Sequence, residues 1–138
     1  MARETLRHAG FAHVTLTQVM PDSLMPIESC DFWYSRIVLQ HNPPPVMARL
    51  LDDLLARLHP GGVAFLQVPT YKAGYRFRID DYLAHQNSTD MEMHFFPQAA
   101  LLELIARRGC RVLEIREDDA IGISLTSISN TLLVQRSG

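Results

Sequence analysis

The stretch between Asn42 and Val68 constrains the fold most, because it holds an amphipathic helix that is followed at once by a buried strand. Asn42 can cap a helix whose first turn accepts the prolines at 43–45, since the amides that proline lacks have no helical partner there. An apolar stripe then recurs at helical spacing; its members are Val46, Met47, Leu50, Leu51, Leu54, Leu55 and Leu58. The sequence His-Pro-Gly-Gly at 59–62 ends the helix, and the apolar run at 63–68 is typical of a buried parallel strand.

Strands and helices alternate along the rest of the chain. A helix over residues 1–9 closes at Gly10, and a second amphipathic helix spans residues 97–108. Further strands are predicted over residues 13–19, 31–39, 110–115 and 130–135. The strand at 31–39 is expected to be buried and to run out near Ser35. This alternation predicts a single α/β domain spanning residues 1–138, with 70–95, where aromatic and arginine side chains mix, as a lid or insertion.

The charge balance excludes some classes of function. The chain has 13 Lys and Arg against 15 Asp and Glu, so it lacks a basic excess for a phosphate backbone or an anionic membrane. No apolar run approaches the roughly 18 residues that span a bilayer, and the amino terminus lacks an apolar signal core. The sequence therefore predicts a cytoplasmic protein that binds neither nucleic acid nor membranes. The cysteines Cys30 and Cys110 form no metal motif and are predicted to be buried thiols.

Several short motifs, in this order and spacing, resemble class I S-adenosylmethionine-dependent methyltransferases. The segment at 31–41, Asp-Phe-Trp-Tyr-Ser-Arg-Ile-Val-Leu-Gln-His, is similar to the fourth strand of that family and its end. Leu-His-Pro-Gly-Gly at 58–62 is similar to the turn before the fifth strand. A bacterial subgroup of uncharacterised methyltransferases is resembled more narrowly at 37–45, 65–71, 74–75, 91–94 and 129–130. The resemblance implies a partial Rossmann-like methyltransferase sandwich, with a mostly parallel sheet and an antiparallel last strand.

The chain departs from this family in its first part. Family members begin with a strand and a glycine-rich turn at the cofactor, followed by a strand that ends in an acid for the ribose. Here the only glycine before residue 61 is Gly10, and residues 1–19 resemble the second helix and third strand of the family. The chain therefore resembles the C-terminal portion of the domain. A missing N-terminal segment of a longer product, or a second subunit, would supply the absent strands.

The absent first strand leaves the strand at 31–39 with an unpaired edge. An unpaired edge with apolar side chains is a template for pairing with another strand. The expected outcomes are rearrangement of residues 14–19 against it, strand exchange, or a homodimer that joins two sheets.

The resemblance places candidate site residues after two strands, where open α/β sheets bind their ligands. S-adenosylmethionine is expected beside Ser35, Arg36, Ile37 and His41. A role of His41 in capping the following helix has equal weight.

His94 is the candidate catalytic residue. Methyl transfer to oxygen or nitrogen often needs a base that accepts a proton, and the family builds its acceptor pocket in this region. The plainer interpretation is a surface histidine beside a turn. A metal bound by His85, Asp90, Glu92 and His94 has suitable ligand types, but no HExxH spacing exists, and no metal is predicted.

The acceptor is expected to contact Gln67, Tyr71, Tyr75 and Arg76. Tyrosine and arginine side chains could stack on and pair with an anionic acceptor, such as a sugar nucleotide or a phosphorylated glycan. Stacking on single-stranded nucleic acid is the alternative, and the negative net charge counts against it. The plainest interpretation is that the rings pack the insertion and the arginines remain in water.

Two functional hypotheses follow. The chain is either a methyltransferase-like enzyme acting on a small molecule or glycan, or a cofactor-free remnant that serves as a dimeric interaction or regulatory module. The missing glycine turn and ribose acid favour the second for this chain taken alone.

Overall fold

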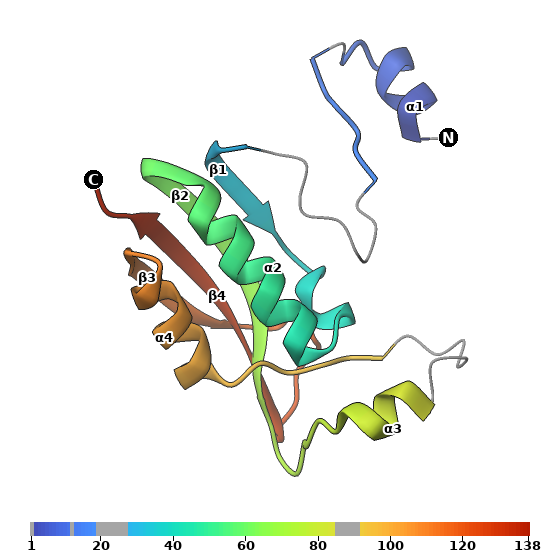
Figure 1. The fold of residues 1–138 in the computed structure, drawn as a ribbon. Helices are drawn as coiled ribbons and strands as arrows, with labels where there is room; N and C mark the ends of the chain where they lie inside the picture. The colour runs from blue at the N-terminus through green and yellow to red at the C-terminus, as the bar shows by residue number, and fades with distance from the viewer. Residues whose placement is uncertain (1, 12, 19–27, 85–91) are drawn as a thin grey trace.

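The computed structural model describes residues 2–11, 13–18, 28–84 and 92–138 (Figure 1). Helices and strands alternate through most of this chain. They are α1 (Ala2–His8), β1 (Cys30–Ser35), the short 3-10 helix η1 (Leu39–His41), α2 (Pro44–Arg57), β2 (Leu58–Lys72), α3 (Ile79–Ala84), α4 (Gln98–Arg107), β3 (Cys110–Asp118) and β4 (Ser127–Arg136).

The strands form one four-stranded sheet in the order β1-β2-β4-β3. β1 pairs with β2 in parallel, whereas β4 runs antiparallel to both β2 and β3. Three strands therefore point in one direction and the last strand in the other. This confirms the predicted α/β fold with a mostly parallel sheet and an antiparallel last strand.

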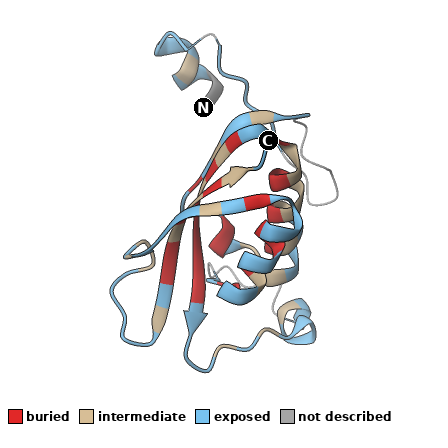
Figure 2. Ribbon diagram, turned by 90° about the vertical axis from the view of Figure 1, so that its left-hand side faces the viewer, coloured by how far each residue is buried: buried red, intermediate tan, exposed pale blue. Residues whose placement is uncertain are grey.

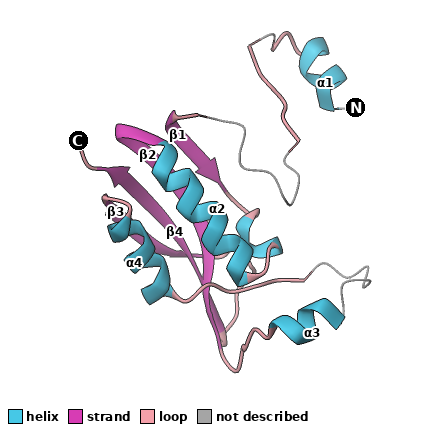
Figure 3. Ribbon diagram, viewed as in Figure 1, coloured by secondary structure: helices cyan, strands magenta, loops and turns pink. Residues whose placement is uncertain are grey.

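The hydrophobic core lies between one face of the sheet and two helices. α2 and α4 lie side by side on this face (Figure 3). α2 contributes Met47, Leu51 and Leu55, all fully buried, and the facing strands contribute Leu66 and Leu132. Burial of such side chains stabilises a fold by about 1.5–3 kcal/mol each. This face is therefore the main source of stability.

The other face of the sheet carries no helix within the described part of the chain (Figure 2). Phe32 and Tyr34 on β1 are about 60% exposed, and their register partners Val63 and Phe65 are only half buried. The rings of Tyr34 and Phe65 stack with centroids 5.4 Å apart. We refer to Phe32, Tyr34, Val63, Phe65 and Leu133 as the open face.

The structure corrects the predicted burial of β1. The strand ends at Ser35, as expected, but two aromatic side chains of the open face lie in water, so the burial predicted from the apolar composition of residues 31–39 is wrong for them. In the described residues β2 is the only strand paired with β1. A buried position requires a covering layer, and the residues that the structure describes place none on this face. Cys30 is likewise only partly buried, whereas Cys110 is buried as predicted; both are free thiols.

Residues 13–18 form neither a helix nor a strand, so the predicted strand over 13–19 is wrong for these residues, and Val19 lies outside the described part. The predicted rearrangement against the edge of β1 is also wrong for 14–18. Alternating polar and β-branched residues favour a strand only where a neighbouring strand accepts the hydrogen bonds. α1 ends before Gly10, whose φ of 77° suits a left-handed residue, as predicted.

The start of α2 differs from the prediction in its cap. Pro43 occupies the N-cap position in an extended conformation, and the Asn42 side chain instead donates to the carbonyls of Val38 and Leu39. Val46 faces water, whereas the rest of the predicted stripe is buried or half buried. β2 begins directly after the helix. Near the start of this strand, a Cβ added at Gly62 would lie 2.8 Å from the His59 carbonyl oxygen, which explains why a glycine stands there.

Candidate functional site

A buried glutamine on β2 joins the segment that follows β1, the short helix η1 and the start of β4. Gln67 on β2 is fully buried in an otherwise apolar run. Its Oε1 accepts the Ile37 amide at 2.8 Å, and its Nε2 donates to Ser129 Oγ at 2.7 Å and to Gln40 Oε1 at 3.3 Å. Ile37 has a φ of 56°, a left-handed conformation that a β-branched residue rarely adopts. The hydrogen bond to Gln67 therefore holds a strained backbone at the carboxyl end of β1.

The same end of the sheet holds His94. The His94 amide donates to the Gln40 carbonyl at 2.8 Å, which ties the segment before α4 to η1. The Nδ1 atom lies 2.9 Å from the Tyr75 hydroxyl, and Nε2 lies 3.1 Å from Glu92 Oε2. His94 is 6% exposed. The interpretation of His94 as a surface histidine is therefore wrong, because its ring is buried with both nitrogens engaged.

The protonation of this cluster follows from its surroundings. Burial lowers the pKa of His94, and the charge and hydrogen bond of Glu92 partly oppose this effect. Burial also raises the pKa of the Tyr75 phenol, a hydrogen bond with the Phe95 backbone opposes this, and the Glu92 charge adds to the rise. At neutral pH the imidazole of His94 is therefore neutral and the phenol of Tyr75 is protonated.

A cavity of about 160 Å³ lies beside this cluster. Phe77 and Tyr82 place their rings edge-on to the His94 ring, with centroids 5.8 Å away in both cases. The lining consists of Tyr75, Arg76, Phe77, Arg78, Asp81, Tyr82, Glu92 and His94. Three aromatic rings and two arginines thus surround a space that reaches a buried histidine.

The structure brings together only some of the residues expected at an acceptor site. Tyr75 and Arg76 line the cavity with His94. Gln67 lies in the buried network and is linked to His94 through Gln40. Tyr71 is 54% exposed on β2, does not line this cavity, and pairs in register with Ile128.

The residues expected at the cofactor lie at the carboxyl end of β1. Ser35 is buried, Arg36 and His41 are exposed, and Ile37 is about half exposed. The His41 amide donates to Val38 within η1, so this residue belongs to a short helix of its own before α2. Arg36 and His41 remain accessible for a ligand in this region.

Sequence reasoning assigned no role in this polar network to Gln40 or Asn130 and considered Glu92 only as a metal ligand. Gln40 and Glu92 each contact His94 or its backbone, and Asn130 accepts hydrogen bonds from Thr70 at 2.6 Å and Gln98 at 3.1 Å. A polar residue within or next to an apolar strand was the available signal, because buried polar groups need hydrogen-bond partners. The partners themselves come from distant segments and leave no local pattern.

The alternative metal site would need His85, Asp90, Glu92 and His94 together. His85 and Asp90 lie outside the described residues. In the ranges that the structure describes, no group of three His, Cys, Asp or Glu side chains is arranged to hold a metal ion.

No helix among the described residues is long and apolar enough to cross a membrane.

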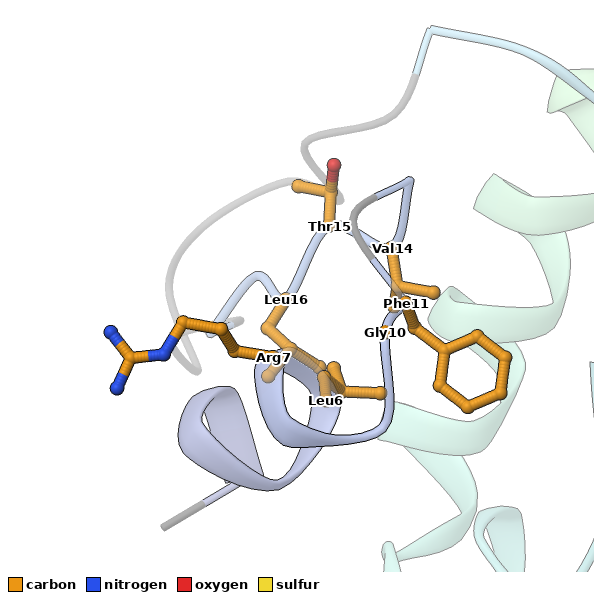
Figure 4. Close-up of a pocket in the computed structure, with 7 residues that line it drawn as sticks. All are labelled: Leu6, Arg7, Gly10, Phe11, Val14, Thr15 and Leu16. Atoms are coloured by element: carbon orange, nitrogen blue, oxygen red, sulfur yellow. The ribbon is translucent and has the colours of Figure 1, made fainter.

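A larger hollow, of about 490 Å³, lies in the N-terminal segment (Figure 4). Its lining comes only from α1 and the residues that follow, Leu6, Arg7, Gly10, Phe11, Val14, Thr15 and Leu16. The Arg7 guanidinium extends away from the apolar side chains. The hollow contains no group suited to proton transfer and lies apart from the His94 cluster.

The residues present fit S-adenosylmethionine only in part. The Ile37 amide is already bonded to Gln67, and no glycine stands between Gly10 and Gly61, so β1 is followed by no glycine turn that could present free amides. The one carboxylate of β1, Asp31, stands at the start of the strand, at the end opposite to Ser35, and pairs with His59. Neither a glycine turn nor a carboxylate therefore stands directly after β1.

Solved structures with a similar fold are mainly methyltransferases. The [4+2]-cyclase SpnF aligns with 99% of this chain and 61% of its own, at 15% identity and a TM-score of 0.68. An S-adenosylmethionine-dependent methyltransferase from Clostridium acetobutylicum aligns with 99% of this chain and 70% of its own, at 9% identity and a TM-score of 0.67. Magnesium protoporphyrin IX methyltransferase from Synechocystis, with bound SAH, aligns with 99% of this chain and 58% of its own, at 13% identity and a TM-score of 0.60.

The chain thus spans 58–70% of the length of these three structures. No protein-family model matches the sequence, and a comparison with curated proteins finds no match either. The cyclase illustrates that one fold serves more than one reaction. The strand order, the strand directions and these alignments agree, and the chain has the fold of the C-terminal portion of a class I S-adenosylmethionine-dependent methyltransferase.

Proposed function

We propose that this chain is the acceptor-binding part of an S-adenosylmethionine-dependent methyltransferase that acts on a small molecule or glycan. The observation that carries the proposal is a buried His94, held by Tyr75 and Glu92, beside a cavity at the carboxyl end of a methyltransferase-like sheet. The segment at 70–95 is then an acceptor-side insertion, because every residue that lines the cavity belongs to it. The cytoplasm remains the predicted location.

His94 is the proposed proton acceptor. A neutral imidazole is the competent form, and burial favours that form at neutral pH. The carboxylate of Glu92 stabilises the imidazolium that forms when a proton arrives. Tyr75 and Arg76 are the proposed acceptor-binding residues, with Gln67 supporting them from within the sheet.

S-adenosylmethionine would supply the methyl group, and Ser35, Arg36, Ile37 and His41 are proposed to form part of its site. Because this side alone does not complete a site, we propose that further strands pair with the edge of β1. A second copy of this chain, a second subunit or an N-terminal segment of a longer product can provide them. The exposed Phe32 and Tyr34 support an added layer on this side.

Thermal-shift titration with S-adenosylhomocysteine, combined with light scattering of the same sample, tests the proposal. A ligand at about 100 times its dissociation constant adds about 2.7 kcal/mol to stability, which corresponds to several degrees. The expected result is a saturable shift in an assembly larger than the 15.6 kDa monomer. A shift in the monomer would overturn the need for added strands.

His41→Ala and His59→Ala form a matched pair for this titration. Both histidines are exposed, but His41 follows β1 and His59 stands at the start of β2, at the opposite end of the sheet. His41→Ala should weaken binding and His59→Ala should leave it unchanged. An equal effect of both changes would remove His41 from the site.

A cofactor-free interaction module is the second candidate. The open face and the unpaired edge of β1 favour it, since both resemble half of an interface. It predicts a homodimer with no response to S-adenosylhomocysteine. Monomers at all concentrations tested would exclude this candidate.

A further inference from the structure

We propose that Tyr75 is the residue that contacts the acceptor, that His94 and Glu92 act through it, and that the acceptor is a phenol. The proposal deepens the proposed function by naming the acceptor class. It rests on that function only for the methylation of the resulting phenolate. Binding and deprotonation of a phenol need no cofactor and can be tested in this chain alone.

The first step of the argument is that an acceptor has no free nitrogen of His94 to approach. Nδ1 faces the Tyr75 hydroxyl, Nε2 faces the Glu92 carboxylate, and the residue is 6% exposed. Tyr75 is half buried and lines the cavity. Because both ring nitrogens of His94 are engaged, we infer that an acceptor in the cavity reaches the phenolic oxygen of Tyr75 and not the imidazole.

The second step concerns the protons. An ionised Glu92 can only accept, so Nε2 carries the hydrogen and donates it to Glu92. Nδ1 of a neutral His94 is then an acceptor, and Tyr75 donates its hydroxyl hydrogen to it. One lone pair of the Tyr75 oxygen accepts a hydrogen bond from the Phe95 backbone, and the other remains available to accept one from a ligand in the cavity.

Proton transfer along this line balances. The O–H bond of the bound phenol breaks and its proton forms a new bond to the Tyr75 oxygen, while the Tyr75 hydroxyl proton moves to His94 Nδ1. The phenol becomes a phenolate, Tyr75 ends as it began, and His94 becomes an imidazolium. Glu92 remains a carboxylate and accepts a hydrogen bond from that imidazolium.

The acceptor class follows from the lining and from acidity. The rings of Tyr75, Phe77 and Tyr82 offer faces and edges to a planar aromatic ligand. A phenol has a pKa of about 10, whereas an ordinary alcohol is far less acidic, so a histidine base is matched to the former. Arg76 and Arg78 at the same cavity favour a phenolate over a phenol, and Asp81 lies with them.

Absorbance of para-nitrophenol gives a direct readout, because its phenolate absorbs visible light and its phenol form does not. The titration is run without cofactor, at a pH where the free compound is mostly protonated. We expect the phenolate fraction of the bound compound to rise several-fold over that of the free compound. Absence of binding, or binding in the phenol form, would overturn the proposal.

Variants separate the relay from simple packing. Tyr75→Phe keeps the ring and should bind para-nitrophenol without the rise in phenolate, and His94→Gln should lose the rise as well. Glu92→Gln should reduce it. Tyr71→Phe, the same change at an exposed tyrosine outside the cavity, is the matched control and should behave as the parent chain. If Tyr82→Phe lost the rise in phenolate and Tyr75→Phe kept it, the acceptor would contact Tyr82 and not Tyr75, which would overturn the proposal.

Nitrogen-15 NMR of the histidine ring tests the arrangement without any ligand. The expected state is a neutral His94 with hydrogen on Nε2, and hydrogen on Nδ1 would overturn the proposal. The outcomes also separate the two proposals. A rise in phenolate without a response to S-adenosylhomocysteine supports the relay and contradicts the methyltransferase. A response to S-adenosylhomocysteine without a rise in phenolate supports the methyltransferase and contradicts the relay.

Discussion

The two faces of the sheet show what a chain needs in order to use its apolar residues. On the covered face, α2 and α4 bury Leu51 and Leu66 completely. On the open face, Phe32 and Tyr34 of the adjoining strand remain about 60% exposed. Both faces have apolar sequences, so composition does not distinguish them. The presence of a second layer does, and only the covered face therefore contributes fully to the stability of the chain.

The largest expected effect comes from removing part of the covered face. Leu51→Ala should lower the free energy of unfolding by about 2–5 kcal/mol, because it leaves a cavity under α2. Urea denaturation measures the change. Val46→Ala, at an exposed position of the same helix, should change it by less than about 0.5 kcal/mol. Equal effects would mean that α2 does not pack as described.

A smaller effect is expected from the polar network beside that core. Gln67→Leu leaves the Ile37 amide and the Ser129 hydroxyl without this partner, which should cost about 1–3 kcal/mol in urea denaturation. Gln135→Leu, which loses two hydrogen bonds between exposed groups, one to the Gly61 carbonyl and one from Arg111, is the control and should cost less. An unchanged free energy in Gln67→Leu would show that water replaces the glutamine.

The pH dependence of stability should reveal His94. Its pKa is lower in the folded chain than the ordinary 6.5, so below pH 6.5 the unfolded chain binds more protons. The free energy of unfolding should therefore fall as the pH drops below about 6.5, and the fall should stop below the folded pKa. His94→Gln should flatten this part of the profile. The control His59→Gln, at the opposite end of the sheet, should leave the decline in place, and a profile unaffected by His94→Gln would contradict the assignment.

The smallest effect on the isolated monomer is expected on the open face. Phe32→Lys should change the free energy of unfolding of a monomer by less than about 0.5 kcal/mol, since the side chain is already in water. The same change should reduce association measured by sedimentation if a further layer covers this face. Tyr71→Lys, at an exposed aromatic residue at the far end of β2, is the control for association. Association that persists in Phe32→Lys would place the contact elsewhere.

The local pattern was sufficient for the elements that carry their own boundaries. The prolines and the leucine spacing of α2, the glycines after α1 and α4, and the apolar run of β2 each identify an element without knowledge of its neighbours. The strand over residues 13–19 failed for the opposite reason. Its alternation is real, but a strand also needs a partner, and the described residues offer none to it.

The amino-acid sequence by itself determined the α/β class, the helix-strand unit around α2 and β2, and the absence of a glycine turn at the end of β1, because each depends on residues adjacent along the chain. The tertiary structure decided that Tyr75, Glu92 and His94 form one cluster and that Gln40 meets Gln67. It also decided which apolar face is covered. These features join segments that are distant in sequence, and burial, which sets their hydrogen bonds and pKa values, exists only once those segments pack together.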